Sequence, residues 1–255
     1  MILEALVWAT QRKAAGAAAS GVAAEQAAIV ARYLRCRRAW RPHLRRCRDF
    51  VFAGAHHARR RGRALVLGSG ALLDIPLAAL AREFAEVVLV DAAHPLHARL
   101  QAWRLGNVVV RPLSLVAADA HPPAYRSWRT ELPPADYVVA SMLLSQLPPP
   151  RAADPGTAWR HALIAAALDD LVRGGEALCV ITETARIVRP RGGRARSEDP
   201  LAGVVPPPAL GAWDWDLAPP GEGVAGAQVV LRVAACLRPA EAASWLVDTA
   251  PPARP

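Results

Sequence analysis

The sequence predicts an α/β fold, namely a doubly wound, mostly parallel seven-stranded sheet with a C-terminal antiparallel hairpin and an N-terminal helical extension. Three observations support this prediction. From residue 63 onward, short apolar runs alternate with helical stretches, as in a parallel sheet that helices cover on both faces. The first run ends in a turn that contains Gly68 and Gly70. Near the C-terminus, the strand-like segments 213–217 and 227–237 flank APPGEGVAG, a Pro- and Gly-rich turn that predicts a hairpin.

The composition of this 255-residue chain limits the possible functions. A formal net charge of +9 favours acidic partners such as nucleic acid, but Lys13 is the only lysine, so a codon bias toward arginine explains the charge as easily. The four cysteines are too scattered to form the disulfide framework of a small secreted domain. No stretch approaches the roughly 20 apolar residues of a membrane helix. We therefore expect a soluble, cytoplasmic protein without a membrane partner.

Residues 1–62 are predicted to form a helical extension that docks on a domain spanning 63–238, with 239–255 as a C-terminal tail. Ser20 is a plausible N-cap for the first long helix. Apolar residues then recur at spacings of three, four and seven, which indicates one apolar stripe: Trp40, Leu44, Cys47, Val51 and Ala58. Twelve arginines between residues 32 and 63 mostly occupy the other faces. A solvated helix face is the favoured interpretation of these arginines, and an electropositive lid is the alternative.

The elements of the main domain follow from its alternating pattern. We expect strands at 63–68, 87–91, 107–111, 136–140 and 176–182, and helices at 72–84, 95–105 and 157–172. Pro76 is expected in the first turn of its helix, and Asp74 is expected to place negative charge near the positive end of the helix dipole. The Arg-, Gly- and Pro-rich region 189–209 is predicted to be a mobile loop and is the candidate for a flap.

The glycine turn and the acidic residues after the next two strands indicate a nucleotide-like ligand. Gly-x-Gly after a strand lets a ligand approach the backbone closely, although a simple strand-to-helix turn uses glycine about as readily. Asp91, 21 residues beyond Gly70, lies where a doubly wound fold presents a carboxylate to a ribose diol, with a helix cap as the alternative. Asp119 would accept a hydrogen bond from an adenine amino group or be an ordinary loop residue. Leu73 occupies the sixth position of the turn, where NAD-binding folds carry Gly or Ala, so the sequence disfavours NAD as the ligand.

At these motifs the chain resembles the class I S-adenosylmethionine-dependent methyltransferases, a Rossmann-like superfamily. The matching segments occur in the same order as in that family: VLGSGALLD, VVLVDAAHP, VAADA, ADYVVASMLLSQLP and LVRGGEALCVITE. The resemblance covers roughly residues 63–237, and the expected hairpin resembles the family's antiparallel seventh strand. It implies an enzyme that transfers a methyl group from S-adenosylmethionine to an acceptor, for which a small molecule is favoured.

The resemblance also implies which residues hold the cofactor. Residues 68–70 would wrap its methionine end, and Asp91 would bind the ribose hydroxyls. Ser141 follows the fourth strand, where the family brings substrate and cofactor together. The complete implied set is Gly68, Ser69, Gly70, Asp91, Ala92, Asp119, Ala120 and Ser141. SMLLSQLPPP stands where family members that methylate amino groups carry an Asn-Pro-Pro-Tyr type of signature, so the acceptor atom and any catalytic residue stay unassigned.

Other chemistry-bearing residues have ordinary explanations that we favour. His94 and His121 are candidate general bases, but loop or helix-start histidines are commoner. One helix face carries Cys36, His43 and Cys47, but the three span ~16 Å at 1.5 Å per residue, too far for one metal ion. We therefore expect no metal. Trp213 and Trp215 alternate with two aspartates, as in a half-buried strand, so core packing is favoured over an aromatic wall for a substrate.

Two other classes of function remain open at this stage. The first is a non-catalytic module with a methyltransferase-like fold, which would bind RNA or an acidic partner through the Arg-rich helices. The second is a nucleotide-dependent oxidoreductase, which Leu73 and the expected final hairpin disfavour. The sequence does not predict an oligomeric state.

Overall fold

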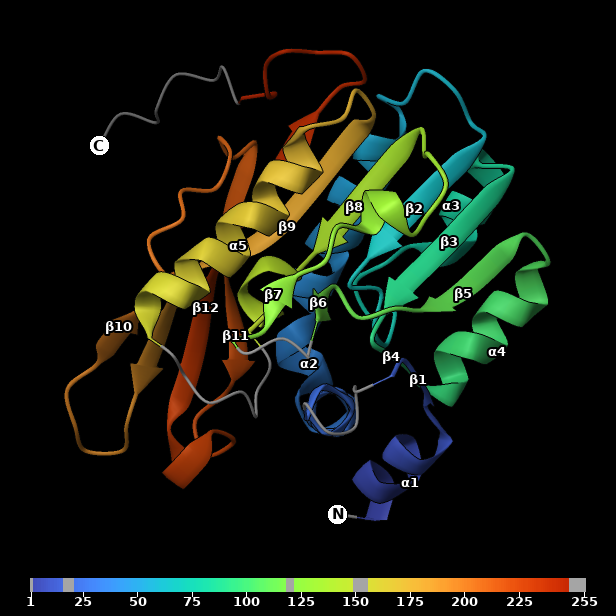
Figure 1. The fold of residues 1–255 in the computed structure, drawn as a ribbon. Coiled ribbons are helices and arrows are strands. Elements are labelled where there is room, and N and C mark those ends of the chain that lie inside the picture. The colour runs from blue at the N-terminus through green and yellow to red at the C-terminus, as the bar shows by residue number, and fades with distance from the viewer. Residues whose placement is uncertain (1, 16–20, 118–121, 149–155, 248–255) are drawn as a thin grey trace.

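The computed structural model describes residues 2–15, 21–117, 122–148 and 156–247. One sheet forms the centre of the molecule, with helices packed on both of its faces (Figure 1). Its strands are β2 (Arg63–Leu67), β3 (Glu86–Asp91), β5 (Val108–Pro112), β8 (Tyr137–Ser141), β9 (Ala177–Arg189), β10 (Arg196–Glu198), β11 (Gly211–Ala218) and β12 (Gln228–Arg238). Short strands form two further pairs: β1 (Arg12–Lys13) with β4 (Ala93–His94), and β6 (Val116–Ala117) with β7 (Ala124–Tyr125).

The helices divide between the two faces of the sheet. The chain contains α1 (Ile2–Thr10), α2 (Val22–Ala55), α3 (Leu77–Glu83), α4 (Leu96–Leu105), α5 (Thr157–Val172) and the 3₁₀ helices η1 (Trp128–Thr130), η2 (Leu144–Gln146) and η3 (Val224–Gly226). Helices α2, α3 and α4 share one hydrophobic cluster with one face of the sheet. Helix α5 covers the opposite face (Figure 1). This two-sided covering confirms the predicted doubly wound α/β fold.

The strand order places one topological switch point at the centre of the sheet. The order is β11-β12-β9-β8-β2-β3-β5, with β10 paired to β9 outside this path. Strands β5, β3, β2, β8 and β9 run parallel to one another, whereas β12 runs antiparallel to both β9 and β11. From β2 the chain first builds outward to β3 and β5, and then crosses to β8 on the other side. Open sheets of this kind bind ligands beyond the carboxyl ends of the strands at such a reversal.

The predicted strands and helices are present, with three corrections. Strand β9 continues past residue 182 to Arg189, because its second half pairs with both β12 and β10. The region 189–209 is therefore not all loop, since β10 forms a hairpin with the end of β9. Helix α3 begins at Leu77 rather than residue 72. Leu72 adopts a left-handed conformation with φ 59°, so Pro76 is the N-cap and Asp74 lies outside the helix.

Helix α2 is one continuous helix of 34 residues and passes through Pro42, whereas the sequence indicated two segments. Gly21 is its N-cap, and Ser20 lies outside the described residues. The predicted apolar stripe is buried, although Ala58 follows the end of the helix. Seven arginines of the helix are exposed: Arg35, Arg37, Arg38, Arg41, Arg45, Arg46 and Arg48. The helix therefore has a docking face and a basic face, as predicted.

Aromatic packing fixes α2 on the terminal hairpin. Trp40 is 1% exposed, donates a hydrogen bond from Nε1 to the Leu217 carbonyl at 2.9 Å, and packs edge-on against Trp215 with ring centroids 4.9 Å apart. His43 stacks on Trp215 at 3.8 Å and accepts a hydrogen bond from Trp213 Nε1 at 3.0 Å. Burial lowers the pKa of His43 to about 3, so its ring is uncharged. Both tryptophans pack in the core, as favoured from the sequence.

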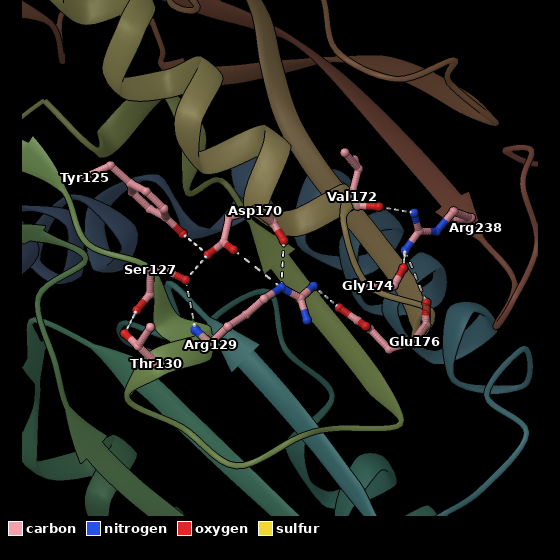
Figure 2. Close-up of polar contacts among 9 residues, drawn as sticks. All are labelled: Tyr125, Ser127, Arg129, Thr130, Asp170, Val172, Gly174, Glu176 and Arg238. Carbon is pink, nitrogen blue, oxygen red and sulfur yellow. Dashed lines mark hydrogen bonds and ion pairs between the residues drawn. The ribbon is translucent and has the colours of Figure 1, made fainter.

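A buried polar network fixes the beginning of β9 (Figure 2). Asp170 of α5 accepts hydrogen bonds at 2.8 Å from the hydroxyls of Tyr125 and Ser127. Arg129 donates to the Asp170 carbonyl at 2.9 Å and also pairs with Glu176. These contacts join η1, the end of α5 and the turn into β9. Since Arg129 is shared by the carboxylates of Asp170 and Glu176 and links these elements, we interpret the network as structural.

The docking of α2 leads to a stability prediction. Trp40→Ala is expected to lower the free energy of unfolding by about 3–5 kcal/mol, because the substitution leaves a large cavity between α2 and the hairpin. Urea denaturation followed by circular dichroism measures the change. Leu34→Ala is the control on the same helix, because Leu34 is 50% exposed, and it is expected to change stability by no more than about 0.5 kcal/mol. Equal losses in the two variants would contradict the docking.

The network of Figure 2 leads to a second stability prediction. Asp170→Ala is expected to cost about 3–5 kcal/mol, because it leaves Arg129 and two hydroxyl groups without their shared carboxylate. Asp169→Ala removes the neighbouring carboxylate, which is exposed, and is expected to cost less than about 0.5 kcal/mol. The same urea titration compares the two variants. A loss below about 1 kcal/mol for Asp170→Ala would show that the network contributes little to stability.

Candidate functional site

A cavity of about 250 Å³ lies at the switch point of the sheet, under α2. Its walls come from the segments that follow β2, from the ends of β3 and β8, from β9, and from the terminal hairpin. Five of the eight predicted site residues line it: Gly68, Ser69, Gly70, Asp91 and Ser141. Ala92 adjoins Asp91 but does not line the cavity, and Asp119 and Ala120 lie outside the described residues. The fold thus brings together residues that are up to 73 positions apart, from Gly68 to Ser141.

The glycine turn has a conformation that requires its glycines. Gly68 has φ 73° and Gly70 has φ 44°, both in the left-handed region. A Cβ atom on Gly68 would lie 3.3 Å from the side chain of Leu143 and from the carbonyl of Ser141. The amides of Gly68 and Ser69 donate to the Val90 carbonyl at 2.9 and 3.1 Å. The turn is therefore held against the end of β3, where its backbone lines the cavity.

The Asp91 carboxylate faces the glycine turn. Its Oδ2 accepts a hydrogen bond from the Gly70 amide at 2.8 Å, and its Oδ1 accepts from the Ala93 amide at 3.1 Å. Gln26 of α2 donates from Nε2 to the same Oδ1 at 3.1 Å. Burial raises the pKa of Asp91 to about 6, although these hydrogen bonds act in the opposite direction. The carboxylate thus has a raised proton affinity and is directed at the glycine turn.

Gln26 is a site residue that the sequence reasoning missed. While its Nε2 is bonded to Asp91, its Oε1 is buried and has no partner among the described residues. A buried amide oxygen without a donor costs free energy that a ligand hydroxyl would recover. The signal in the sequence was weak, because Gln26 is one polar residue in an alanine-rich helix.

Two further polar pairs lie beside the glycine turn. Ser141 donates a hydrogen bond from its hydroxyl to the Asp74 carboxylate, and burial raises the pKa of Asp74. Ser69 Oγ lies 3.0 Å from His94 Nε2. His94 is fully buried and its pKa is lowered to about 4 by this burial, so it stays neutral and supports Ser69 from behind the cavity wall. His121 lies outside the described residues.

The remaining candidates from the sequence do not form a separate site. Within the described ranges, no group of three or more His, Cys, Asp or Glu side chains is placed to hold a metal ion. Cys36, His43 and Cys47 belong to the buried docking stripe of α2. In the same part of the chain, no helix combines the length and apolar character needed to cross a bilayer.

The comparisons with known proteins give distant likenesses of structure. No protein-family model and no curated protein sequence matches the chain. It is similar to 1,6-didemethyltoxoflavin-N1-methyltransferase of Burkholderia thailandensis, with 16% identity over 88% of this chain and 91% of that chain and a TM-score of 0.45. It is also similar to an rRNA methylase of Streptococcus thermophilus, with 13% identity over 74% and 94% of the two chains and a TM-score of 0.34. The fold is defined by the strand order of the central sheet.

That strand order matches the expectation drawn from the sequence. The parallel strands, the reversal between β2 and β8, and an antiparallel β12 inserted between β9 and β11 form the Rossmann-like fold expected from the resemblance to class I methyltransferases. The insertion of an antiparallel strand distinguishes this sheet from the six-stranded parallel order 3-2-1-4-5-6 of dinucleotide-binding folds.

Proposed function

We propose that the protein is a methyltransferase that binds S-adenosylmethionine in the cavity under α2. The observation that carries the proposal is the contact between Asp91, at the end of the second parallel strand, and Gly70 in the turn after the first. The residues fit the cofactor in two respects. A Cβ on Gly70 would lie 3.3 Å from Gln26 Nε2 and 3.6 Å from Asp91 Oδ2 and would narrow the space beside them, and the buried Oε1 of Gln26 lacks a donor that a ribose hydroxyl would supply.

Each residue of the site has a proposed task in holding the cofactor. The backbone of residues 68–70 would lie along its methionine end, and Asp91 Oδ2 with Gln26 Oε1 would accept hydrogen bonds from the two ribose hydroxyls. Ser141, held by Asp74, would border the reacting centre. From the resemblance, we retain Ala92, Asp119 and Ala120 as proposed neighbours of the adenosine. The bound cofactor supplies an activated methyl group, so the protein contributes mainly position and exclusion of water.

The extension is part of the proposed site. We propose residues 1–62 as a cap, 63–238 as the methyltransferase domain and 239–255 as a tail. The cavity volume of about 250 Å³ is below the range of about 300–1,000 Å³ common for ligand sites, so the start of α2 would move outward to admit the cofactor. A cavity that a helix covers favours a small-molecule acceptor.

The exposed arginines of α2 favour a second candidate function. Seven of them form the basic face, which suits a non-catalytic module that holds RNA or an acidic partner. None of the seven lines the cavity, although Arg48 donates to the carbonyl of Leu73, which does. RNA retention that weakens steeply with salt, together with no affinity for S-adenosylmethionine, would favour this candidate over the methyltransferase.

The proposed function leads to a prediction for Asp91. Asp91→Ala is expected to weaken S-adenosylmethionine binding by about ten- to hundredfold, because charge-assisted hydrogen bonds contribute about 1.5–3 kcal/mol each. Isothermal titration calorimetry measures both affinities. Asp214→Ala is the control, because Asp214 is exposed on β11 and outside the cavity. Equal affinity in wild type and Asp91→Ala would refute the ribose assignment.

The raised pKa of Asp91 leads to a prediction for pH. A pKa of about 6 leaves about one tenth of the carboxylate ionised at pH 5 and about nine tenths at pH 7. Since ribose hydroxyls donate to the ionised form, the dissociation constant for S-adenosylmethionine is expected to be about tenfold higher at pH 5 than at pH 7. Calorimetry at the two pH values tests this. Asp91→Asn is expected to abolish the difference, whereas Glu25→Gln, which removes another carboxylate of the cavity, should preserve it.

A further inference from the structure

A carboxylate interrupts an apolar row on β9. Ala177, Cys179 and Ile181 lie in the cluster under α2, and none is measurably exposed. Alternation along the strand makes Glu183 the next residue of this row, and it is 2% exposed. Burying a carboxylate costs free energy that an apolar side chain would not. Packing alone therefore does not explain a glutamate at this position.

The surroundings of Glu183 form the charged part of the cavity wall. Arg186 donates from Nη2 to Glu183 Oε1 at 3.0 Å, and its own side chain is 40% exposed. Glu25 and Arg32 of α2 line the same cavity. The buried Nε atoms of Arg32 and Arg186 have no hydrogen-bond partner among the described residues. Some hydrogen-bond donors of this wall thus have no acceptor among the described residues.

Another part of the cavity wall is aromatic. Trp40, His43 and Trp215 all line the cavity, and His43 and Trp215 stack with an interplanar angle of 1°. The indole Nε1 of Trp215 is buried and has no partner within the described chain. Because His43 is uncharged and held by Trp213, this aromatic wall is rigid. Aromatic walls favour ligands that are themselves planar rings, since contacts between aromatic rings contribute about 0.5–1.5 kcal/mol beyond the area that they bury.

The proposed cofactor-binding residues and the residues around Glu183 belong to different halves of the sheet. The proposed cofactor ligands follow β2 and β3, whereas Glu183 and Trp215 belong to β9 and β11 on the other side of the switch point. Ser141 ends β8, between the two groups, and pairs in register with Ile181, two residues before Glu183. The cavity is continuous across this division.

We infer that the β9 half of the cavity binds the methyl acceptor as a small planar molecule with a ring N–H or a phenolic O–H, which donates to Glu183. This inference rests on the proposed function. As the acceptor nitrogen or oxygen bonds to the methyl carbon, the electron pair of the carbon–sulfur bond stays on sulfur. The N–H or O–H proton becomes strongly acidic while that bond forms, so an ordinary carboxylate accepts it in the same step, which leaves its electron pair on the acceptor atom, and later releases the proton to solvent.

The test uses binding of probes to the full-length protein saturated with S-adenosylhomocysteine. The probes are planar compounds in pairs, benzimidazole with 1-methylbenzimidazole and 2-naphthol with 2-methoxynaphthalene. Saturation-transfer NMR measures their affinities. In wild type, the members with a free N–H or O–H are expected to bind at least about fivefold more tightly than their methylated partners. Glu183→Leu is expected to reduce this preference to less than about twofold, and the exposed Glu198→Leu is expected to retain it.

Two further measurements separate a binding role of Glu183 from a structural one. Glu183→Leu is expected to keep its affinity for S-adenosylhomocysteine within about twofold and to unfold at the same or a higher temperature. A leucine continues the apolar row, and Arg186, whose side chain is 40% exposed, keeps its charge in contact with solvent when its partner is removed. An unchanged preference in Glu183→Leu, equal binding of methylated and free probes, or no probe binding at all would overturn the inference. Failure of wild type to bind S-adenosylhomocysteine would instead refute the proposed function, and this inference with it.

Discussion

The packing of Trp40 and His43 against Trp215 is the interaction on which the rest of the site depends. It fixes a 34-residue helix across one face of the sheet, and the helix turns an open crevice at the switch point into a covered cavity. The same helix brings Gln26 to the Asp91 carboxylate. The N-terminal extension thus supplies both the cover and one polar wall of the site, and a sheet without it would leave Asp91 facing water.

Three carboxylates around the cavity are stabilised in different ways. Backbone amides and the Gln26 amide hold Asp91, the Ser141 hydroxyl holds Asp74, and the Arg186 guanidinium holds Glu183. Hydrogen bonds from neutral donors leave the negative charge available to a ligand, whereas an arginine largely neutralises it. Asp91 is therefore suited to accept hydrogen bonds from hydroxyl groups. Glu183 is suited to accept a proton that has become acidic during methyl transfer.

The sequence predicted those parts of the site whose positions follow from the local pattern of strands and turns. The glycine turn and Asp91 each follow an apolar run, so strand alternation placed both at one edge of the sheet. Gln26 and Glu183 gave no such signal, because their roles come from the docking of α2 and from the unusual length of β9. The predicted start of α3 was wrong because Leu72 adopts a left-handed conformation, which a leucine rarely does. Contacts distant along the chain and local strain thus limited the prediction.

The net positive charge of the chain says little about the cavity, because few of its arginines reach it. None of the seven exposed arginines of α2 lines the cavity, although Arg48 donates to the carbonyl of Leu73 and Arg46 lies over the ring of Trp213. The charge of the basic face therefore adjoins the site without lining it. Exposed charges are screened over about 8 Å at physiological salt, whereas the cavity groups interact at hydrogen-bond distance under a covering helix. Of the two arginines that line the cavity, Arg32 and Arg186, the second is paired with a buried carboxylate. The chemistry of the cavity is therefore set by its few carboxylates and aromatic rings, and the net charge of the chain does not reveal it.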